Sequence, residues 1–136
     1  MVGALQDRDG TVRARAARAL DLIGPVAQAA VPALVEAMRD REARVRVQAA
    51  EALWQVARDP ASVAVLAEVL REKDLTPEDH RWAAQALGRI GPPARAARPI
   101  LTELTRAGDF VLRSTAADAL QKIDPEAARE AGVWLR

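Results

Sequence analysis

Few residues in this sequence could do chemistry, and they do not form a catalytic set. His80 is the only histidine, cysteine is absent, and Ser62 and Ser114 have no histidine near them in the sequence. A hydrolase needs a nucleophile with a base in reach, and a metal site needs clustered histidine, cysteine or carboxylate ligands. The glycines are scattered and form no phosphate-binding loop. We therefore predict a protein that is not an enzyme, with no metal and no cofactor.

The composition predicts a small helical domain. Half of the 136 residues are hydrophobic, but there are only one phenylalanine, three tryptophans and no tyrosine. The core must then consist of alanine, leucine, valine and isoleucine, which suits closely packed helices. The length predicts a single domain over residues 1–136.

Charge and hydropathy exclude several classes of partner. Twenty basic residues against nineteen acidic ones leave a net charge of +1, whereas nucleic acid or an anionic membrane usually requires a basic excess. No uninterrupted apolar run approaches the roughly 18 residues of a membrane helix, and the start of the chain does not resemble a signal peptide. We expect a soluble, unprocessed chain that binds neither nucleic acid nor membrane, and the absence of cysteine fits the cytoplasm.

An internal repeat is the main signal in the sequence. Four segments align without a gap and follow one another at nearly equal intervals: VRARAARALDLIG from Val12, VRVQAAEALWQVA from Val45, DHRWAAQALGRIG from Asp79 and LRSTAADALQKID from Leu112. Each has the period of one amphipathic helix. The recurring apolar positions are Ala16/Ala17, Ala49/Ala50, Ala83/Ala84 and Ala116/Ala117, then Leu20, Leu53, Leu87 and Leu120, then Ile23, Val56, Ile90 and Ile123. We expect the alanines to allow close helix packing and the larger residues to supply the buried area.

Second helices are expected between these first ones. The strings GPVAQAAVPALVEAM from Gly24 and GPPARAARPILTEL from Gly91 match each other two repeats apart. The glycines suit a left-handed helix stop, and the prolines after them suit a first helical turn. The middle repeat has Asp59 and Pro60 there instead. The first helices should start at equivalent caps, namely Asp9, Glu42, Thr76 and Asp109.

The cap positions also suggest ion pairs. Arg13, Arg46 and Arg113 follow the acidic caps Asp9, Glu42 and Asp109 by four residues, a spacing that favours pairing on a helix. His80 takes the same place after Thr76. We expect His80 to have a structural or surface role.

Both ends of the chain continue the repeat. MVGALQD aligns with LVEAMRD of the next repeat, which is the end of a second helix, so the chain opens inside a helix. We expect either a fragment of a longer solenoid or a reduced cap, and an uncapped end would allow self-association. Residues 125–136 should form a last helix in which Trp134 covers the final repeat.

The pattern D-x-x-V-R-x-x-A-A-x-A-L-x-x-I-G resembles HEAT repeats, in particular the short bacterial type related to phycobilisome lyases. This resemblance covers residues 1–124. It implies an all-α fold, a right-handed α-α superhelix of about eight helices in four hairpins. It says little about function, because proteins of this fold include scaffolds, adaptors, lyases, hydroxylases and glycosylases. The hydroxylases use His-Glu pairs that are absent here.

Two sets of residues are candidates for partner binding. On the second helices, Glu36, Glu68 and Glu103 form one track, and Arg39, Arg71 and Arg106 form another three residues later. Two interpretations stay open, either solvated pairs within each helix or a repeated charge pattern that grips a protein segment. The glutamates would repel nucleic acid.

Trp54 and Trp82 are the second set. Their counterparts in other repeats are mostly polar, which indicates exposed positions. They could anchor a partner or pack onto a neighbouring helix.

We therefore expect a non-enzymatic module or scaffold that binds a protein or peptide. One alternative is an accessory subunit of a bilin chromophore lyase, and another is a designed or consensus-derived repeat scaffold.

Overall fold

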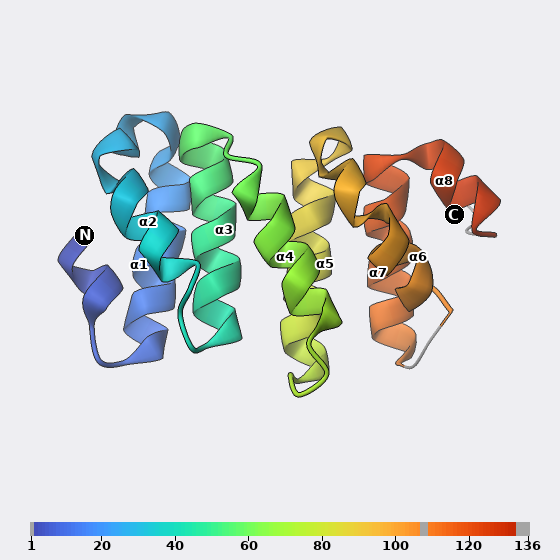
Figure 1. The fold of residues 1–136 in the computed structure, drawn as a ribbon, viewed down its shortest axis with the longest axis horizontal. Coiled ribbons are helices and arrows are strands. Elements are labelled where there is room, and N and C mark those ends of the chain that lie inside the picture. Colours follow the sequence, from blue (N-terminus) through green and yellow to red (C-terminus); the bar gives the residue numbers. More distant parts are fainter. Residues whose placement is uncertain (1, 107–108, 133–136) are drawn as a thin grey trace. The chain divides into compact units, whose positions relative to one another are not determined.

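The computed structural model describes residues 2–106 and 109–132, and within these ranges it contains helices and no strand. The α-helices are α1 Gly10–Ile23, α2 Val31–Ala37, α3 Ala43–Ala57, α4 Ala61–Arg71, α5 Pro77–Ile90, α6 Arg98–Leu104, α7 Phe110–Ile123 and α8 Pro125–Glu130 (Figure 1). The described residues also form three 3-10 helices: η1 Val2–Gln6 before α1, η2 Gly24–Ala30 between α1 and α2, and η3 Pro92–Ala97 between α5 and α6. The prediction of an all-α fold with about eight helices is confirmed.

The chain divides into two compact units, Met1–Val65 and Leu66–Arg136. In the first, α1 packs against α3, and α2 packs against α3 as well. In the second, α5 packs against α7, which also contacts α6 and α8. The unit boundary falls inside α4, and the single domain over residues 1–136 stays a prediction.

The first helices begin at the predicted caps. The side chains of Asp9 and Asp109 accept hydrogen bonds from the backbone N–H two residues later, at 2.8 and 3.0 Å. Thr76 forms a reciprocal capping box with Asp79. Glu42 occupies the cap position of α3, but its side chain caps nothing. Three of the four side-chain caps are therefore confirmed.

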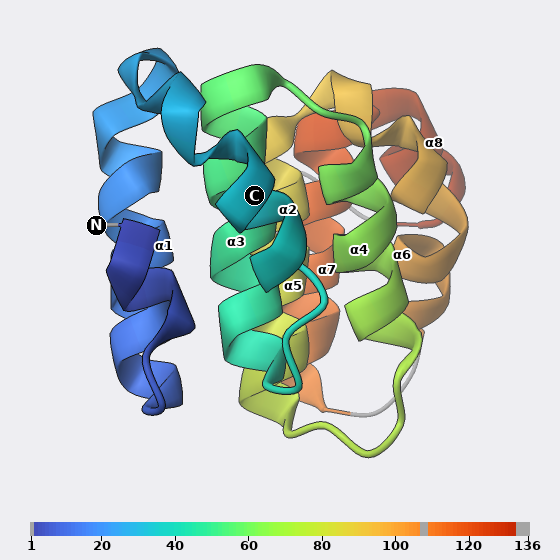
Figure 2. The same cartoon turned by 60° about the vertical axis from the view of Figure 1, so that its left-hand side comes forward.

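The leucines of the first helices form the core as predicted. Leu20 is 3% exposed, and Leu53, Leu87 and Leu120 are fully buried. The isoleucine position is less uniform, because Ile123 is buried whereas Ile23 is 45% exposed. The prediction that Ile23 is a core residue is wrong. Ile23 lies at the end of α1 next to Gly24. The described element before α1, the five-residue η1, lies along the other end of α1 (Figure 2).

The second elements of repeats one and three are bent, whereas the sequence suggested one continuous helix for each. Each starts as a 3-10 helix and continues as a separate α-helix, α2 or α6. Non-helical backbone occurs at Ala27 and Ala94. Pro32 and Pro99, near the start of α2 and α6, explain the break, since proline lacks an N–H and its ring clashes with the carbonyl four residues earlier.

Gly24 and Gly91 end α1 and α5 with positive φ, as predicted, but not in the left-handed helical conformation. Their φ/ψ angles are 74°/−144° and 79°/−146°. This conformation is the mirror image of extended backbone, which side chains with a Cβ atom essentially do not adopt. In the middle repeat the left-handed residue is Arg58, at φ 53° and ψ 38°, and Asp59 then accepts from the N–H of Ala61.

The ends of the described chain follow the repeat in part. The 3-10 helix η1 packs against α1, and its Leu5 is 5% exposed, which agrees with a helical opening segment. Asp7 accepts from the N–H of Asp9 just as Asp40, at the same position of the next repeat, accepts from the N–H of Glu42. At the other end α8 stops at Glu130. The predicted core residue Trp134 lies outside the described residues.

Candidate functional site

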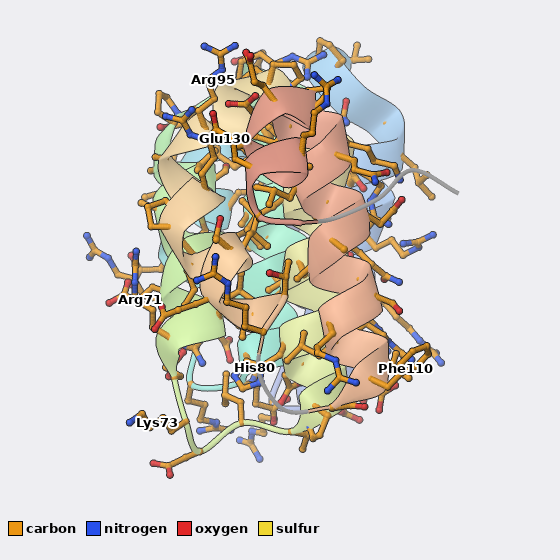
Figure 3. All side chains as sticks on the ribbon, turned by 90° about the vertical axis from the view of Figure 1, so that its right-hand side faces the viewer. Arg71, Lys73, His80, Arg95, Phe110 and Glu130 are labelled. Carbon is orange, nitrogen blue, oxygen red and sulfur yellow. The ribbon has the colours of Figure 1, made fainter. Side chains whose placement is uncertain are left out.

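The charged side chains of the second helices are exposed. Glu36 on α2, Glu68 on α4 and Glu103 on α6 are all open to solvent, and so are Arg39, Arg71 and Arg106. Figure 3 shows Arg71 extending away from the ribbon. None of the three Glu-Arg pairs within a helix forms an ion pair in the described residues. Both interpretations of these residues stay open, and both tracks present their charges to solvent.

The backbone fixes the spacing of these charges in the same way in both units. The N–H of Arg39 donates to the carbonyl oxygen of Glu36 at 3.0 Å, and the N–H of Arg106 donates to that of Glu103 at 3.1 Å. Each arginine thus lies just beyond the end of its helix, where a cation is favourable. The alignment of the tracks along all three repeats stays a prediction.

Trp54 is not the exposed anchor that its polar counterparts indicated. Its side chain is 9% exposed, and the guanidinium carbon of Arg58 lies 5.4 Å from the ring centroid, within cation-π range. The polar residues at the equivalent positions of other repeats predicted an exposed Trp54. This prediction is wrong because the position that Trp54 and Gly88 share is buried in both repeats. Gly88 there is buried, with Ala119 so close that an added Cβ would come within 3.2 Å of its Cα. Trp82 is half-buried, so its role as an anchor stays a prediction.

Arg13 and His80, which share one register position, both hold the segment before their own helix. Arg13 donates from Nη1 to the carbonyl oxygens of Asp7 and Arg8, at 2.7 and 3.0 Å. Nε2 of His80 lies 2.6 Å from the carbonyl oxygen of Glu72. A carbonyl can only accept, so this nitrogen carries the proton. The predicted pairing of Arg13 with Asp9 is wrong, because its carboxylate partner is Asp40, at 2.8 Å.

The residues that could act as nucleophiles are not brought together. Ser62 is fully buried, and its hydroxyl has no hydrogen-bond partner among the described residues. Ser114 is exposed, at a different register position on a first helix. Within residues 2–106 and 109–132, no three His, Cys, Asp or Glu side chains are grouped to hold a metal.

One segment qualifies as a membrane span by length and composition, which corrects the expectation that none approaches it. This segment is Gly10–Ala37, 28 residues near the N-terminus. Its backbone breaks at Gly24, and its helices α1 and α2 have 14 and 7 residues. Each is shorter than the roughly 20 residues that cross a bilayer as a helix. The segment is therefore weak evidence for a membrane location.

Sequence reasoning missed an exposed apolar group at the junction of α1 and η2. Leu22 is 75% and Val26 is 85% exposed. The signal was available in the repeat, since Leu22 stands where the other first helices have Gln55, Arg89 and Lys122. With Ile23, which is 45% exposed, Leu22 and Val26 form a small group of exposed apolar side chains.

Paired helices that pack through alanine and leucine faces, with exposed charges on the second helices, define an α-solenoid repeat protein. The family model for HEAT repeats matches residues 2–76, more than half of the chain, and that for the PBS lyase HEAT-like repeat matches residues 79–106. The chain belongs to the HEAT repeat family.

Solved structures share this fold. A crystal structure of an engineered protein aligns with a TM-score of 0.62 at 25% identity, over 96% of this chain and 66% of that chain. The chain thus spans slightly less than two thirds of that protein. The complex of CpcE and CpcF of phycocyanin lyase from Nostoc sp. PCC7120 aligns with a TM-score of 0.65 at 24% identity, over 96% of this chain and 81% of that chain. No curated protein matches the chain.

Proposed function

We propose that this protein is a non-enzymatic scaffold that binds a protein segment along its second helices. The observation that carries the proposal is the repeated Glu-x-x-Arg pattern, with all six side chains exposed and none of the three pairs joined by an ion pair. Charges that form no ion pair with a described residue are available to a partner without breaking such a contact. Alternating signs favour a partner segment that itself carries both charges.

The experiment compares two sets of charge-neutralising substitutions. In the first, the three glutamates and three arginines of the second helices become glutamine. In the matched control, exposed charges outside the second helices are neutralised, namely Arg41, Arg44, Asp74 and Glu78. Binding is measured by calorimetry with a partner purified on the wild-type chain. We expect the first set to weaken binding at least about tenfold with unchanged melting temperature, and the control set to leave it unchanged. Equal binding by both variants would refute the proposal.

A second candidate is an accessory subunit of a bilin lyase. It is favoured by the match of residues 79–106 to the PBS lyase HEAT-like repeat and by the likeness to the CpcE and CpcF complex. In this role the exposed second helices would contact a companion subunit. A bilin-transfer assay with candidate companion chains tests it, and transfer that is the same with and without this chain would exclude it. The designed-scaffold alternative has only the likeness to an engineered protein in its favour.

A further inference from the structure

In each unit, two first helices pack together through faces that carry alanines. We call the face that α1 and α5 present in this contact the forward face, and the face that α3 and α7 present the rear face. In the first unit α1 packs against α3, and Ala17 and Ala52 are both fully buried. In the second unit α5 packs against α7, and Ala84 is fully buried while Ala119 is 1% exposed. In both units, therefore, the forward face of one helix packs against the rear face of the other, and equivalent alanines are buried on each side.

Two faces of this kind are left uncovered in the described residues. On the rear face of α1, Ala19 is half-buried although its equivalents Ala52 and Ala119 are buried, and Leu22 beside it is 75% exposed. On the forward face of α7, Ala117 is half-buried although its equivalents Ala17 and Ala84 are fully buried. Phe110, at the start of α7, is 67% exposed and projects from the helix (Figure 3).

The register also places a carboxylate of one face opposite arginines of the other. In the α5–α7 junction, Gln85 of α5 lines a groove together with Thr115 and Asp118 of α7. Suppose that α7 of one copy lies against α1 of another copy as α5 lies against α7 within one chain. Asp118 of α7 then takes the position of Gln85. Arg15 and Arg18 of α1 take the positions of Thr115 and Asp118. Asp118 would therefore lie opposite two arginines. Lys122, at the position of Arg89, would come to the place where the exposed Leu22 replaces a lysine.

The charges at these positions are free to make that contact. Arg15 and Arg18 are exposed and form no ion pair with another described residue. Among the described residues, Asp118 pairs with Lys122 of its own helix, at 3.1 Å, with both side chains more than half exposed. Such an exposed pair contributes little and is readily exchanged.

We propose that a second copy of this chain docks its α7 forward face on the α1 rear face, and so repeats between molecules the junction that α5 and α7 form within one. The contact is heterologous, since the two copies use different surfaces, and it leaves one face of each kind open. Association should then continue beyond a dimer as the concentration rises. This inference is independent of the proposed function, because it uses the first helices and not the charged tracks of the second.

The test uses one variant for each face. Leu22→Asp blocks the rear face of α1, and Ala117→Glu blocks the forward face of α7. The molar mass is measured by light scattering after size exclusion, at protein concentrations up to about 1 mM. The wild type should form a series of oligomers that grows with concentration. Each variant alone should be monomeric. An equimolar mixture should form dimers and nothing larger, because each variant keeps the face that the other has lost.

The controls separate this contact from general stickiness and from misfolding. Val26→Asp changes an even more exposed apolar residue whose repeat equivalent, Pro93, does not line the α5–α7 groove, and this variant should associate like wild type. If Ala117→Glu lowers the melting temperature, Phe110→Asp is used in its place to block the forward face of α7. Asp118→Arg should weaken association about tenfold or more, and adding Arg18→Asp should restore it.

Three results would overturn the proposal. One is a wild-type chain that stays monomeric over the whole concentration range. Another is association that Leu22→Asp and Ala117→Glu leave unchanged. The third is a mixture of the two variants that stays monomeric or forms assemblies larger than a dimer.

Discussion

Arg13 and Asp40 form a two-point contact, in which Nε and Nη2 of the guanidinium donate to the two carboxylate oxygens at 2.8 and 3.1 Å. The other hydrogen bond to this carboxylate comes from the N–H of Glu42, at 2.9 Å. Since Arg13 also holds the carbonyl oxygens of Asp7 and Arg8, this cluster links the segments before α1 and α3. One arginine thus fixes the entry of two successive first helices.

This contact predicts a loss of stability in acid. Burial raises the pKa of Asp40, but the hydrogen bonds from Arg13 and from the N–H of Glu42 outweigh burial, and the net pKa is lowered. The pKa of Asp124 is lowered too, by the hydrogen bond from Arg98 and by the N–H of Ala127. A lowered pKa in the folded state adds stability above the unfolded value of about 4, and this stability is lost as the pH falls through the folded value.

The measurement is a series of melting temperatures between pH 7 and pH 2. Asp40→Asn should lower the melting temperature at pH 7 and make the fall in acid shallower. The exposed Asp74 provides the control, and Asp74→Asn should follow wild type throughout. If the melting temperature of the wild type stays constant as the pH is lowered from 4 to 2, the assigned role of the carboxylates is contradicted.

Trp54→Ala should destabilise the protein by about 3 to 5 kcal/mol, as expected for a buried aromatic. The reason is that the ring is 9% exposed and also lies under Arg58. Urea unfolding provides the free energy. Arg58→Ala, which removes only the cation, should cost about 1 kcal/mol or less. A loss below about 1 kcal/mol for Trp54→Ala would instead restore its interpretation as an exposed anchor.

Gly24→Ala and Gly91→Ala should each destabilise by more than about 1 kcal/mol, because an alanine at these φ/ψ angles is strained. Crowding is not the cause, since a Cβ at Gly24 would meet nothing within 4 Å. Gly3→Ala is the control, because a Cβ there also meets nothing and its φ is not positive. Equal unfolding free energies for Gly24→Ala and Gly3→Ala would show that the turn does not depend on glycine.

Ser62→Ala should stabilise the protein by about 1 kcal/mol, because it removes a buried hydroxyl that has no hydrogen-bond partner in the part of the chain that the structure describes. The repeat supports this, since the equivalent positions hold Ala30 and Ala97, both buried. The reverse change, Ala97→Ser, should destabilise by a similar amount. If Ser62→Ala lowers the midpoint of denaturation, the hydroxyl must have a hydrogen-bond partner in solution.

The sequence was most informative where one physical requirement recurs in every repeat. The leucine of each first helix and the caps at Asp9, Thr76 and Asp109 follow from helical period and local hydrogen bonding, and these were predicted. The bend before α2 was missed because only one of its two prolines was weighed. It would have been visible from Pro32.

Features that depend on contacts between repeats were harder to predict. The position of Trp54 has polar or small counterparts, but polarity in one repeat does not show what packs against another. Arg13 binds Asp40, 27 residues away, although the local spacing favoured Asp9. In both cases a contact from a distant segment outweighed the local pattern.

Hydrogen exchange of the chain with and without its purified partner tests most directly whether the second helices form the binding surface. Measured at a concentration where the chain alone is monomeric, added protection should be confined to α2, α4 and α6. The backbone next to Glu36, Glu68 and Glu103 should be protected most. Protection confined to the first helices α1, α3, α5 and α7, with the second helices unchanged, would contradict the account.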